Sequence, residues 1–390
     1  MQKLVSDRAR SIGYSGLRMM GEIAKEIKEP IINFSIGDIA DDTPMNINEA
    51  CFKALQNGRT HYTPILGLLE LREALAEKLI KENNIEADPT SEIMIAAGGS
   101  EGLNTTFLAT INPGDEILLG DPYYSLFAPM VSISGGKIVS FPLKEENNFR
   151  LDPESIKQRI NPKTKMIILC NPHNPSGRVR SKEELLAVAN IAKDNNLLIL
   201  SDETYERIIY DGNKHLSIGS FPGMKKRTIT MISLSKIYAM TGWRLAYVVA
   251  QKELMIHIAK IHAYNVSAAQ TPGQYAALEA VRDPHEAVLK RLRKFTKRRD
   301  FIVKRLNEIE GVSCHMPEGT FYAFPNVSSY GKTSFEIAEY ILRKAKVFSV
   351  HGTAYGDNGE GYLRFNYAYP ESMLEIEEGM NRMEEALKDL

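Results

Sequence analysis

The chain has few cysteines, almost no net charge and no long apolar run. Its 390 residues include three cysteines, Cys51, Cys170 and Cys314, whose wide spacing fits neither a disulfide framework nor a metal knuckle. A formal net charge of −1 provides no global field that would attract nucleic acid or anionic lipid. No apolar run approaches the roughly 20 residues that span a bilayer, and Met1–Gly21 lacks the apolar core of a secretory signal. We therefore expect a cytoplasmic protein with no metal site, no nucleic-acid partner and no membrane partner.

Between residues 92 and 250 the chain alternates short apolar runs with helical patterns. Continuous apolar runs are typical of strands buried on both faces, and intervening helices favour parallel pairing. After about residue 283 a long helix is followed by mixed strands and helices. We therefore expect an α/β fold, a three-layer sandwich with a mostly parallel central sheet, plus a smaller α+β domain. The expected division is an N-terminal arm with part of the small domain (1–45), a large domain (46–282) and a small C-terminal domain (283–390).

The predicted long helix, Pro284 to Glu310, contains a strongly basic run at Lys290–Arg299. An apolar stripe that includes Leu292 and Leu306 lies beside this run. The run is interpreted as the solvent-exposed face of the helix rather than as a nucleic-acid site, because no other part of the chain is comparably basic.

The stretch Ser233–Arg244 carries the clearest chemical signal. Lys236 follows a predicted buried strand, Thr228–Ser233, and lies among small hydroxyl residues. A buried ammonium without a carboxylate partner is costly, but a desolvated lysine that has lost its proton can form an imine with a carbonyl group. Arg244 lies beyond a Thr-Gly break, where it could reach an anion held near Lys236. The structural alternative is a loop lysine and a surface arginine.

A glycine-rich turn at residues 98–102 follows another predicted strand and opens a helix. Ligands of doubly wound α/β sheets bind outside the carboxyl ends of the strands, and the free amides of such a turn can hold a phosphate. A hydroxyl and a planar cation would add to the same phosphate site. A bare glycine turn is the structural alternative. The expected phosphate-binding residues are Gly99, Ser100, Glu101, Ser233 and Arg244.

The remaining strand ends predict a site for an aromatic ring. Tyr124 offers a flat face, although a tyrosine there is more often simply packed. Asp202 ends an apolar strand, where it could keep a pyridinium nitrogen protonated or cap a helix. Tyr205 and Asn174 could hydrogen-bond to a ring oxygen. A phosphate, a ring with a nitrogen and a hydroxyl, and a carbonyl for Lys236 together describe pyridoxal 5′-phosphate, which supplies an electron sink.

Arg364 lies between Leu363 and Phe365 in a predicted strand. A half-buried arginine needs an anion, and a bidentate clamp on a substrate carboxylate suits the guanidinium geometry. A structural salt bridge is the alternative.

These motifs resemble those of fold-type I pyridoxal-phosphate enzymes, specifically class I/II aminotransferases with the aspartate aminotransferase-like fold, along nearly the whole chain. The resemblance implies that Lys236 bonds to the cofactor and then shuttles a proton, and that Asp202 binds the ring nitrogen. It also implies that Tyr205 and Asn174 touch the ring oxygen and that Tyr124 stacks on the ring. The motifs are Tyr62-Thr-Pro, Gly98-Gly-Ser, Asp121-Pro-Tyr-Tyr, Asn171-Pro-His-Asn-Pro-Ser-Gly, Ser201-Asp-Glu-Thr-Tyr, Ser235-Lys-Ile-Tyr-Ala-Met-Thr-Gly-Trp-Arg and Leu363-Arg-Phe.

By the same resemblance, Tyr62 reaches the phosphate of a neighbouring subunit, which implies a homodimer with shared active sites. Arg364, with Asn174 and the Gly37 backbone, would hold the substrate α-carboxylate. The loop that begins at Gly37 departs from the common family pattern, and some aspartate-specialised relatives carry a lysine where Ser100 stands.

The implied activity is transfer of an amino group between an L-amino acid and a 2-oxo acid. The donor is aspartate, an aromatic residue or another amino acid, and 2-oxoglutarate is the expected acceptor. The segment Cys170–Val179 also looks like that of C–S β-lyases, which leaves this reaction as an alternative. A non-catalytic regulator that binds the cofactor is a remote alternative, because Lys236 and Arg364 are both present. The sequence does not reveal which residues read the donor side chain.

Overall fold

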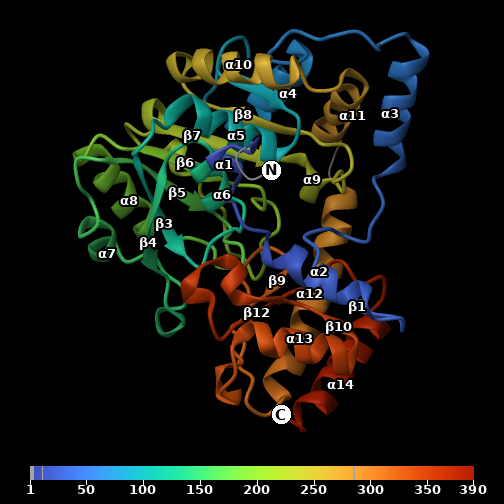
Figure 1. Ribbon diagram of the computed structural model, residues 1–390. Coiled ribbons are helices and arrows are strands. Elements are labelled where there is room, and N and C mark those ends of the chain that lie inside the picture. The colour runs from blue at the N-terminus through green and yellow to red at the C-terminus, as the bar shows by residue number, and fades with distance from the viewer. Residues whose placement is uncertain (1–3, 11, 284–285) are drawn as a thin grey trace.

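The structure is a computed structural model that describes residues 4–10, 12–283 and 286–390. Its centre is a seven-stranded sheet in the order β2-β8-β7-β6-β5-β3-β4 (Figure 1). Strands β3 to β7 pair in parallel, whereas β8 is antiparallel to β2 and β7. The strands are β2 (Ile93–Ala96), β3 (Glu116–Asp121), β4 (Lys137–Pro142), β5 (Thr164–Cys170), β6 (Leu198–Asp202), β7 (Thr228–Ser233) and β8 (Ala246–Val249).

Helices cover both faces of this sheet, because the central strands carry apolar side chains on both faces. In β5, Met166 and Ile168 belong to a core cluster with helices α5, α6 and α10, whereas Ile167 and Leu169 pack with α8. The expected three-layer α/β fold is therefore confirmed. The helices of these layers are α3 (Met45–Gln56), α4 (Leu69–Lys78), α5 (Gly99–Thr110), α6 (Phe127–Ile133), α7 (Pro153–Lys157), α8 (Lys182–Asp194), α9 (Leu234–Ile237), α10 (Lys252–Val266) and α11 (Thr271–Arg282).

The N-terminal segment and the C-terminal third form a second core (Figure 1), which also includes Tyr205, Ile208, Tyr210 and Ala239. Strand β1 (Ile32–Asn33) pairs in parallel with β10 (Val347–Phe348), although the two lie more than 300 residues apart. A three-stranded antiparallel sheet has the order β11-β12-β9. The division of the chain at residues 45 and 282 stays a prediction. The other elements are α1 (Asp7–Arg10), α2 (Gly16–Lys25), α12 (Glu286–Glu308), β9 (Tyr322–Ala323), α13 (Ser334–Ala345), β11 (Val350–His351), β12 (Leu363–Asn366) and α14 (Met373–Leu387).

The basic run on α12 is not simply an exposed helix face, so that interpretation needs correction. Arg291, Arg298 and Arg299 are buried. The Arg298 guanidinium donates to the carbonyls of Tyr367 and Ala368, at 3.2 Å each. Burial is tolerated because each guanidinium finds carbonyl or carboxylate partners on neighbouring segments. These arginines therefore join α12 to the rest of the protein.

The helix that begins at Leu69 changes its winding near its end. The α-helix α4 stops at Lys78, and a π-helical turn, η2, continues it from Leu79 to Asn83. The wider turn directs Asn83 toward the loop after β6, where its amide bonds to carboxylates. Sequence periodicity does not distinguish the two windings. Across the part of the chain described here, no helix is long and apolar enough to cross a bilayer.

Candidate active site

A cavity lies at the carboxyl ends of β5, β6 and β7, beside the first turn of α5. It brings together most of the residues that the sequence singled out. Glu101, Gly37, Arg364 and Tyr62 are not among its lining residues. The predicted residues that line it are Gly99, Ser100, Tyr124, Asn174, Asp202, Tyr205, Ser233, Lys236 and Arg244.

Lys236 reaches the cavity from the short helix α9, which begins directly after β7. All six residues of β7 are buried, and Ser233 at its end caps α9 by accepting a hydrogen bond from the Ser235 amide at 3.2 Å. The Lys236 ammonium donates to the backbone carbonyl of Gly37. Burial lowers the pKa of Lys236 to about 8, and the nearby Asp38 carboxylate opposes this shift. A neutral, nucleophilic amine is therefore accessible near neutral pH.

Asp202, the last residue of β6, presents its carboxylate to the same cavity. The Thr204 amide and hydroxyl both donate to Oδ1, at 3.1 and 2.7 Å. Because both bonds reach Oδ1, the other oxygen can accept from a ligand in the cavity. Burial raises the pKa of Asp202 to about 6, while the Thr204 hydrogen bonds act in the opposite direction.

The turn before α5 forms one end of the cavity. Gly98 has φ +87°, a conformation that favours glycine. A Cβ at this position would lie 2.5 Å from Nη2 of Arg244, so the guanidinium rests directly on the turn. The first amides of α5 have no partners within the helix. This end combines oriented N–H groups, a cation and the Ser100 and Ser233 hydroxyls, a donor set that suits a phosphate.

The side chain of Glu101 is not among the groups that line the cavity. Its Oε2 accepts from the Ala97 amide at 3.0 Å, and its Oε1 lies 2.9 Å from Nδ1 of buried His262. Only the backbone amide of Glu101 is therefore available to an anion at the start of α5.

Arg364 lies on β12, adjacent to the cavity residue Asn174. Its Nη2 donates to the Ser35 carbonyl at 2.6 Å, and its Nη1 donates to Oδ1 of Asn174 at 3.4 Å. The guanidinium carbon lies 4.2 Å from the ring centre of Tyr322 and 4.8 Å from that of Tyr355. Within the described residues, the buried Nε has no hydrogen-bond partner. This orphaned donor suits a carboxylate ligand.

Gly37 and Tyr62 occupy different surroundings. A Cβ on Gly37 would lie 2.9 Å from the Tyr322 hydroxyl, so the backbone of Gly37 passes between this tyrosine and Lys236. Tyr62 is 88% exposed and lies outside the cavity of its own chain.

Sequence reasoning missed Thr204 and Tyr322. The spacing of Asp202 and Thr204 fits a local side-chain turn, a signal that was available in the sequence. The hydroxyl of Tyr322 lies 2.9 Å from that of Tyr205, 117 residues away in the chain. No local pattern could reveal this second contact.

The comparisons with known proteins agree with this geometry. The family model described as aminotransferase class I and II matches residues 29–377. The chain is 42% identical to an aspartate aminotransferase of Pyrococcus abyssi, covering 99% of this chain and 98% of the relative. It is 41% identical to aromatic-amino-acid aminotransferase 2 of Thermococcus litoralis, with the same coverage. The solved alanine aminotransferase of Pyrococcus furiosus superimposes with a TM-score of 0.93 at 34% identity, covering 99% of this chain and 100% of that one.

The family match spans most of the chain, and the structural match extends over both cores. The chain belongs to the class I and II aminotransferase family and is an aminotransferase of the fold-type I architecture.

Proposed function

We propose that this aminotransferase binds pyridoxal 5′-phosphate in the cavity and transfers an amino group between an L-amino acid and a 2-oxo acid in amino acid metabolism. The observation that supports it most is the meeting of Lys236, Asp202 and the turn before α5 in one cavity. When bound, the cofactor supplies an aldehyde and an electron sink. The family is known for this cofactor, and the residues of the cavity fit each of its parts.

The proposed phosphate site is the start of α5, with the amides of Gly99, Ser100 and Glu101. Ser233 contributes a hydroxyl, and Arg244 contributes a guanidinium. The glycine at 98 supports this role, because a side chain there would displace Arg244.

The proposed ring site lies between Tyr124 and Asp202. Tyr124 would offer its aromatic face, and the Asp202 carboxylate would accept from the protonated ring nitrogen. Tyr205 and Asn174 bond to the ring oxygen. Thr204 supports this assignment, because it fixes the orientation of the Asp202 carboxylate.

The proposed catalytic role of Lys236 is that of a base and an acid at Nζ. Nζ would hold the cofactor through its aldehyde carbon. Once the substrate amino group displaced it, the freed amine would take the proton from the substrate Cα and give it to that cofactor carbon. Its lowered pKa, about 8, allows Nζ both to release and to take up a proton near neutral pH. Gly37 orients Nζ through its carbonyl.

The proposed substrate clamp is Arg364, assisted by Asn174 and the backbone of Gly37. The unpartnered Nε and the two flanking tyrosine rings present the guanidinium edge to a carboxylate. A bidentate pair of this kind would fix the α-carboxylate of both the amino acid and the 2-oxo acid.

We also propose a cytoplasmic homodimer with shared active sites. The exposed Tyr62 (88%), Phe52 (60%) and Tyr264 (93%) are large aromatic side chains that a second copy would cover. In this arrangement Tyr62 reaches the phosphate in the partner subunit.

The side chain of the amino donor is not assigned. The names of the three proteins compared above mention aspartate, aromatic amino acids and alanine. We propose 2-oxoglutarate as the acceptor. The experiment is an amino-donor panel on the cofactor-loaded protein, read by its visible absorption band. A productive donor should bleach the band, and 2-oxoglutarate should restore it.

Two outcomes would overturn the proposal. Release of pyruvate and ammonia from cysteine conjugates, without any need for an oxo acid, would assign a C–S β-lyase. A loaded protein that reacts with no donor would leave a non-catalytic regulator. Borohydride reduction and mass spectrometry should place the cofactor on Lys236.

A further inference from the structure

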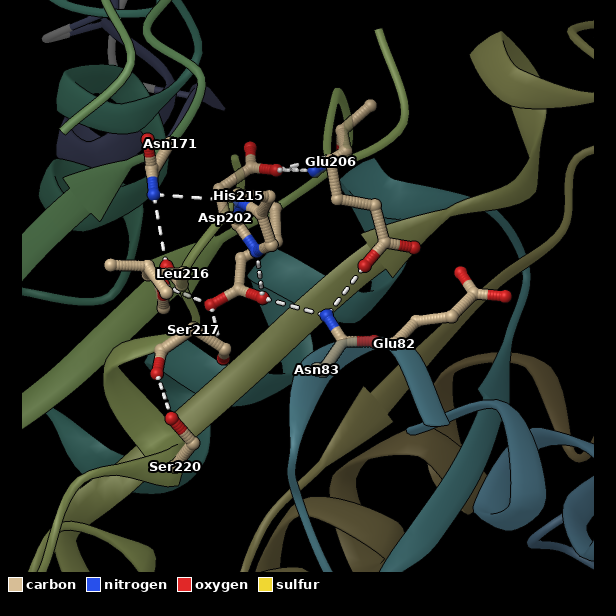
Figure 2. A network of polar contacts seen from close by, with 12 residues as sticks. Glu82, Asn83, Asn171, Asp202, Glu206, His215, Leu216, Ser217 and Ser220 are labelled. Carbon is tan, nitrogen blue, oxygen red and sulfur yellow. Dashed lines mark hydrogen bonds and ion pairs between the residues drawn. The ribbon is translucent and has the colours of Figure 1, made fainter. Parts of the chain in front are cut away.

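A buried polar cluster lies behind Asp202, on the far side of the strand end from the cavity. The Ser201 hydroxyl donates to Oε1 of Glu203 at 2.8 Å, so residues 201 and 203 face the same way. Successive residues of a strand point to opposite faces, and Asp202 between them faces the cavity. Figure 2 shows Asn83, Glu206 and His215 converging on this cluster.

The Glu203 carboxylate is fully buried and accepts four hydrogen bonds from uncharged groups. The Ser201 and Ser217 hydroxyls donate to Oε1, at 2.8 and 2.7 Å. Nε2 of His215 and the Asn83 amide lie 2.9 and 3.3 Å from Oε2. This number of donors stabilises the ionised carboxylate in place of water.

The tautomer of His215 follows from the orientation of Asn171. Oδ1 of Asn171 accepts from the Arg180 amide at 2.9 Å, so its Nδ2 faces the Leu216 carbonyl at 3.1 Å and Nδ1 of His215 at 3.5 Å. With this amide as the donor, Nδ1 is assigned as the acceptor and the ring proton is assigned to Nε2, which donates to Glu203. In this tautomer His215 contributes a hydrogen bond to Glu203 and no charge.

The other charges of the cluster pair with one another. Lys78 donates to Oε1 of Glu206 and to the Asn83 side-chain oxygen, the latter at 2.8 Å. Arg207 pairs with Glu82. Two carboxylates are thus matched by two cations, and Glu203 remains as one excess negative charge. The atoms of Glu203, Glu206 and His215 could in principle surround a metal ion, but their oxygens already accept from Lys78, Asn83 and the hydroxyls.

We propose that Glu203 is a positioning residue that acts through Asp202: its buried charge holds the proton between Asp202 and the cofactor ring nitrogen. This inference rests on the proposed function. A fixed negative charge in a water-poor region favours the protonated form of any nearby nitrogen base. The repulsion between the two carboxylates also contributes to the raised pKa of Asp202, after the larger effect of burial.

Charged groups on the cavity side act against this charge. Lys236 faces Asp202 as a cation, and Arg244 and Arg364 lie close enough to lower the pKa of Lys236. On the sheet side, Glu203 is the charged neighbour that affects Asp202. In the cofactor-free protein the buried charge behind the strand therefore acts on the pKa of Asp202 in the opposite direction to Lys236.

The test is the pH titration of the visible band of the cofactor-loaded protein. Glu203→Gln preserves the shape of the side chain but removes its charge, so the midpoint of this titration should fall by about one pH unit. The turnover number should fall about tenfold, while KM for the 2-oxo acid should change little. Ser217→Ala is the matched control, because it removes a hydrogen bond to the same carboxylate and retains the charge. It should lower the melting temperature without moving the midpoint.

Glu206→Gln provides a second charge-removing variant if Glu203→Gln does not fold. This substitution removes one negative charge from the same cluster and leaves Lys78 with Asn83 and Glu82 as partners. The midpoint of the visible-band titration should therefore fall, but by less than in Glu203→Gln. A wild-type midpoint in either folded charge-removing variant would overturn the inference and leave a purely structural cluster. Failure of the wild-type protein to form the absorbing species would instead contradict the proposed function.

Discussion

The hydroxyl of Tyr322 lies 2.9 Å from the hydroxyl of Tyr205. The first comes from β9 of the small core and the second from the loop after β6 of the large sheet. This hydrogen bond connects the group that would meet the cofactor oxygen with the ring that lies 4.2 Å from the Arg364 guanidinium. The proposed substrate clamp and the proposed ring site therefore share a side chain.

Tyr322→Phe should separate these two roles. The phenylalanine ring would still lie against Arg364, but Tyr205 would lose its hydroxyl partner. We expect the turnover number to fall about fivefold to tenfold, as for the loss of one buried hydrogen bond of about 1 kcal/mol, with KM for the amino acid within about twofold. Steady-state kinetics measure both values. Tyr355→Phe should change neither, because its ring, too, would remain against Arg364. A large KM change in Tyr322→Phe would mean that the hydroxyl orients the clamp.

Capture of the cofactor by the cofactor-free protein should depend on pH through Lys236. Burial lowers the pKa of this amine to about 8, so the reactive neutral form decreases as the pH falls below that value. We expect labelling of Lys236 by an amine-reactive reagent to rise with a midpoint near pH 8, measured by peptide mass spectrometry. Exposed lysines such as Lys304 provide the internal control in the same digest. A midpoint for Lys236 equal to that of the exposed lysines would contradict the burial effect.

Asp202→Asn should stabilise the cofactor-free protein at alkaline pH. The folded pKa of Asp202, about 6, is higher than its usual value of 3.8. The folded state therefore holds this proton more tightly than the unfolded chain, so stability is lost as the pH rises from about 4 to about 6, and the full penalty remains above pH 6. Removal of the carboxylate should raise the free energy of unfolding at pH 8 by about 3 kcal/mol, and this gain should disappear near pH 4.

The measurement is chemical denaturation of the cofactor-free wild-type and Asp202→Asn proteins at both pH values. The same substitution should weaken the visible band of the loaded protein, because an amide cannot keep the ring nitrogen protonated. Equal stability of the two proteins at pH 8 would show that the buried carboxylate carries no penalty in the folded state.

Gly98→Ala should loosen the proposed phosphate site. The alanine would adopt an unfavourable positive φ, and its methyl group would lie 2.5 Å from the Arg244 guanidinium. We expect a destabilisation of about 1–2 kcal/mol and weaker retention of pyridoxal phosphate during dialysis. Gly242→Ala is the matched control, since its Cβ meets no atom within 4 Å and its φ is not positive. Cofactor retention equal to that of Gly242→Ala would argue against a phosphate at this turn.

The sequence alone was sufficient to predict which residues lie at the strand ends. Asp202, Ser233 and the turn before α5 each follow a continuous apolar strand, and parallel strands bring their carboxyl ends to one edge. The expected strand Thr228–Ser233 is present with the same bounds. By contrast, the apolar run at residues 31–36 forms only the two-residue strand β1, whose partner β10 is equally short.

What the sequence by itself determined was the sheet, its ligand-binding edge and the residue types along that edge, since local apolar patterns and chain order set these. The tertiary structure alone decided that Tyr322 meets Tyr205, that Glu203 is buried beside His215, and that three arginines of α12 are buried. Each of these depends on segments that are distant in the chain and on the loss of water around their polar groups. Neither the contact nor the desolvation leaves a periodic trace in the sequence.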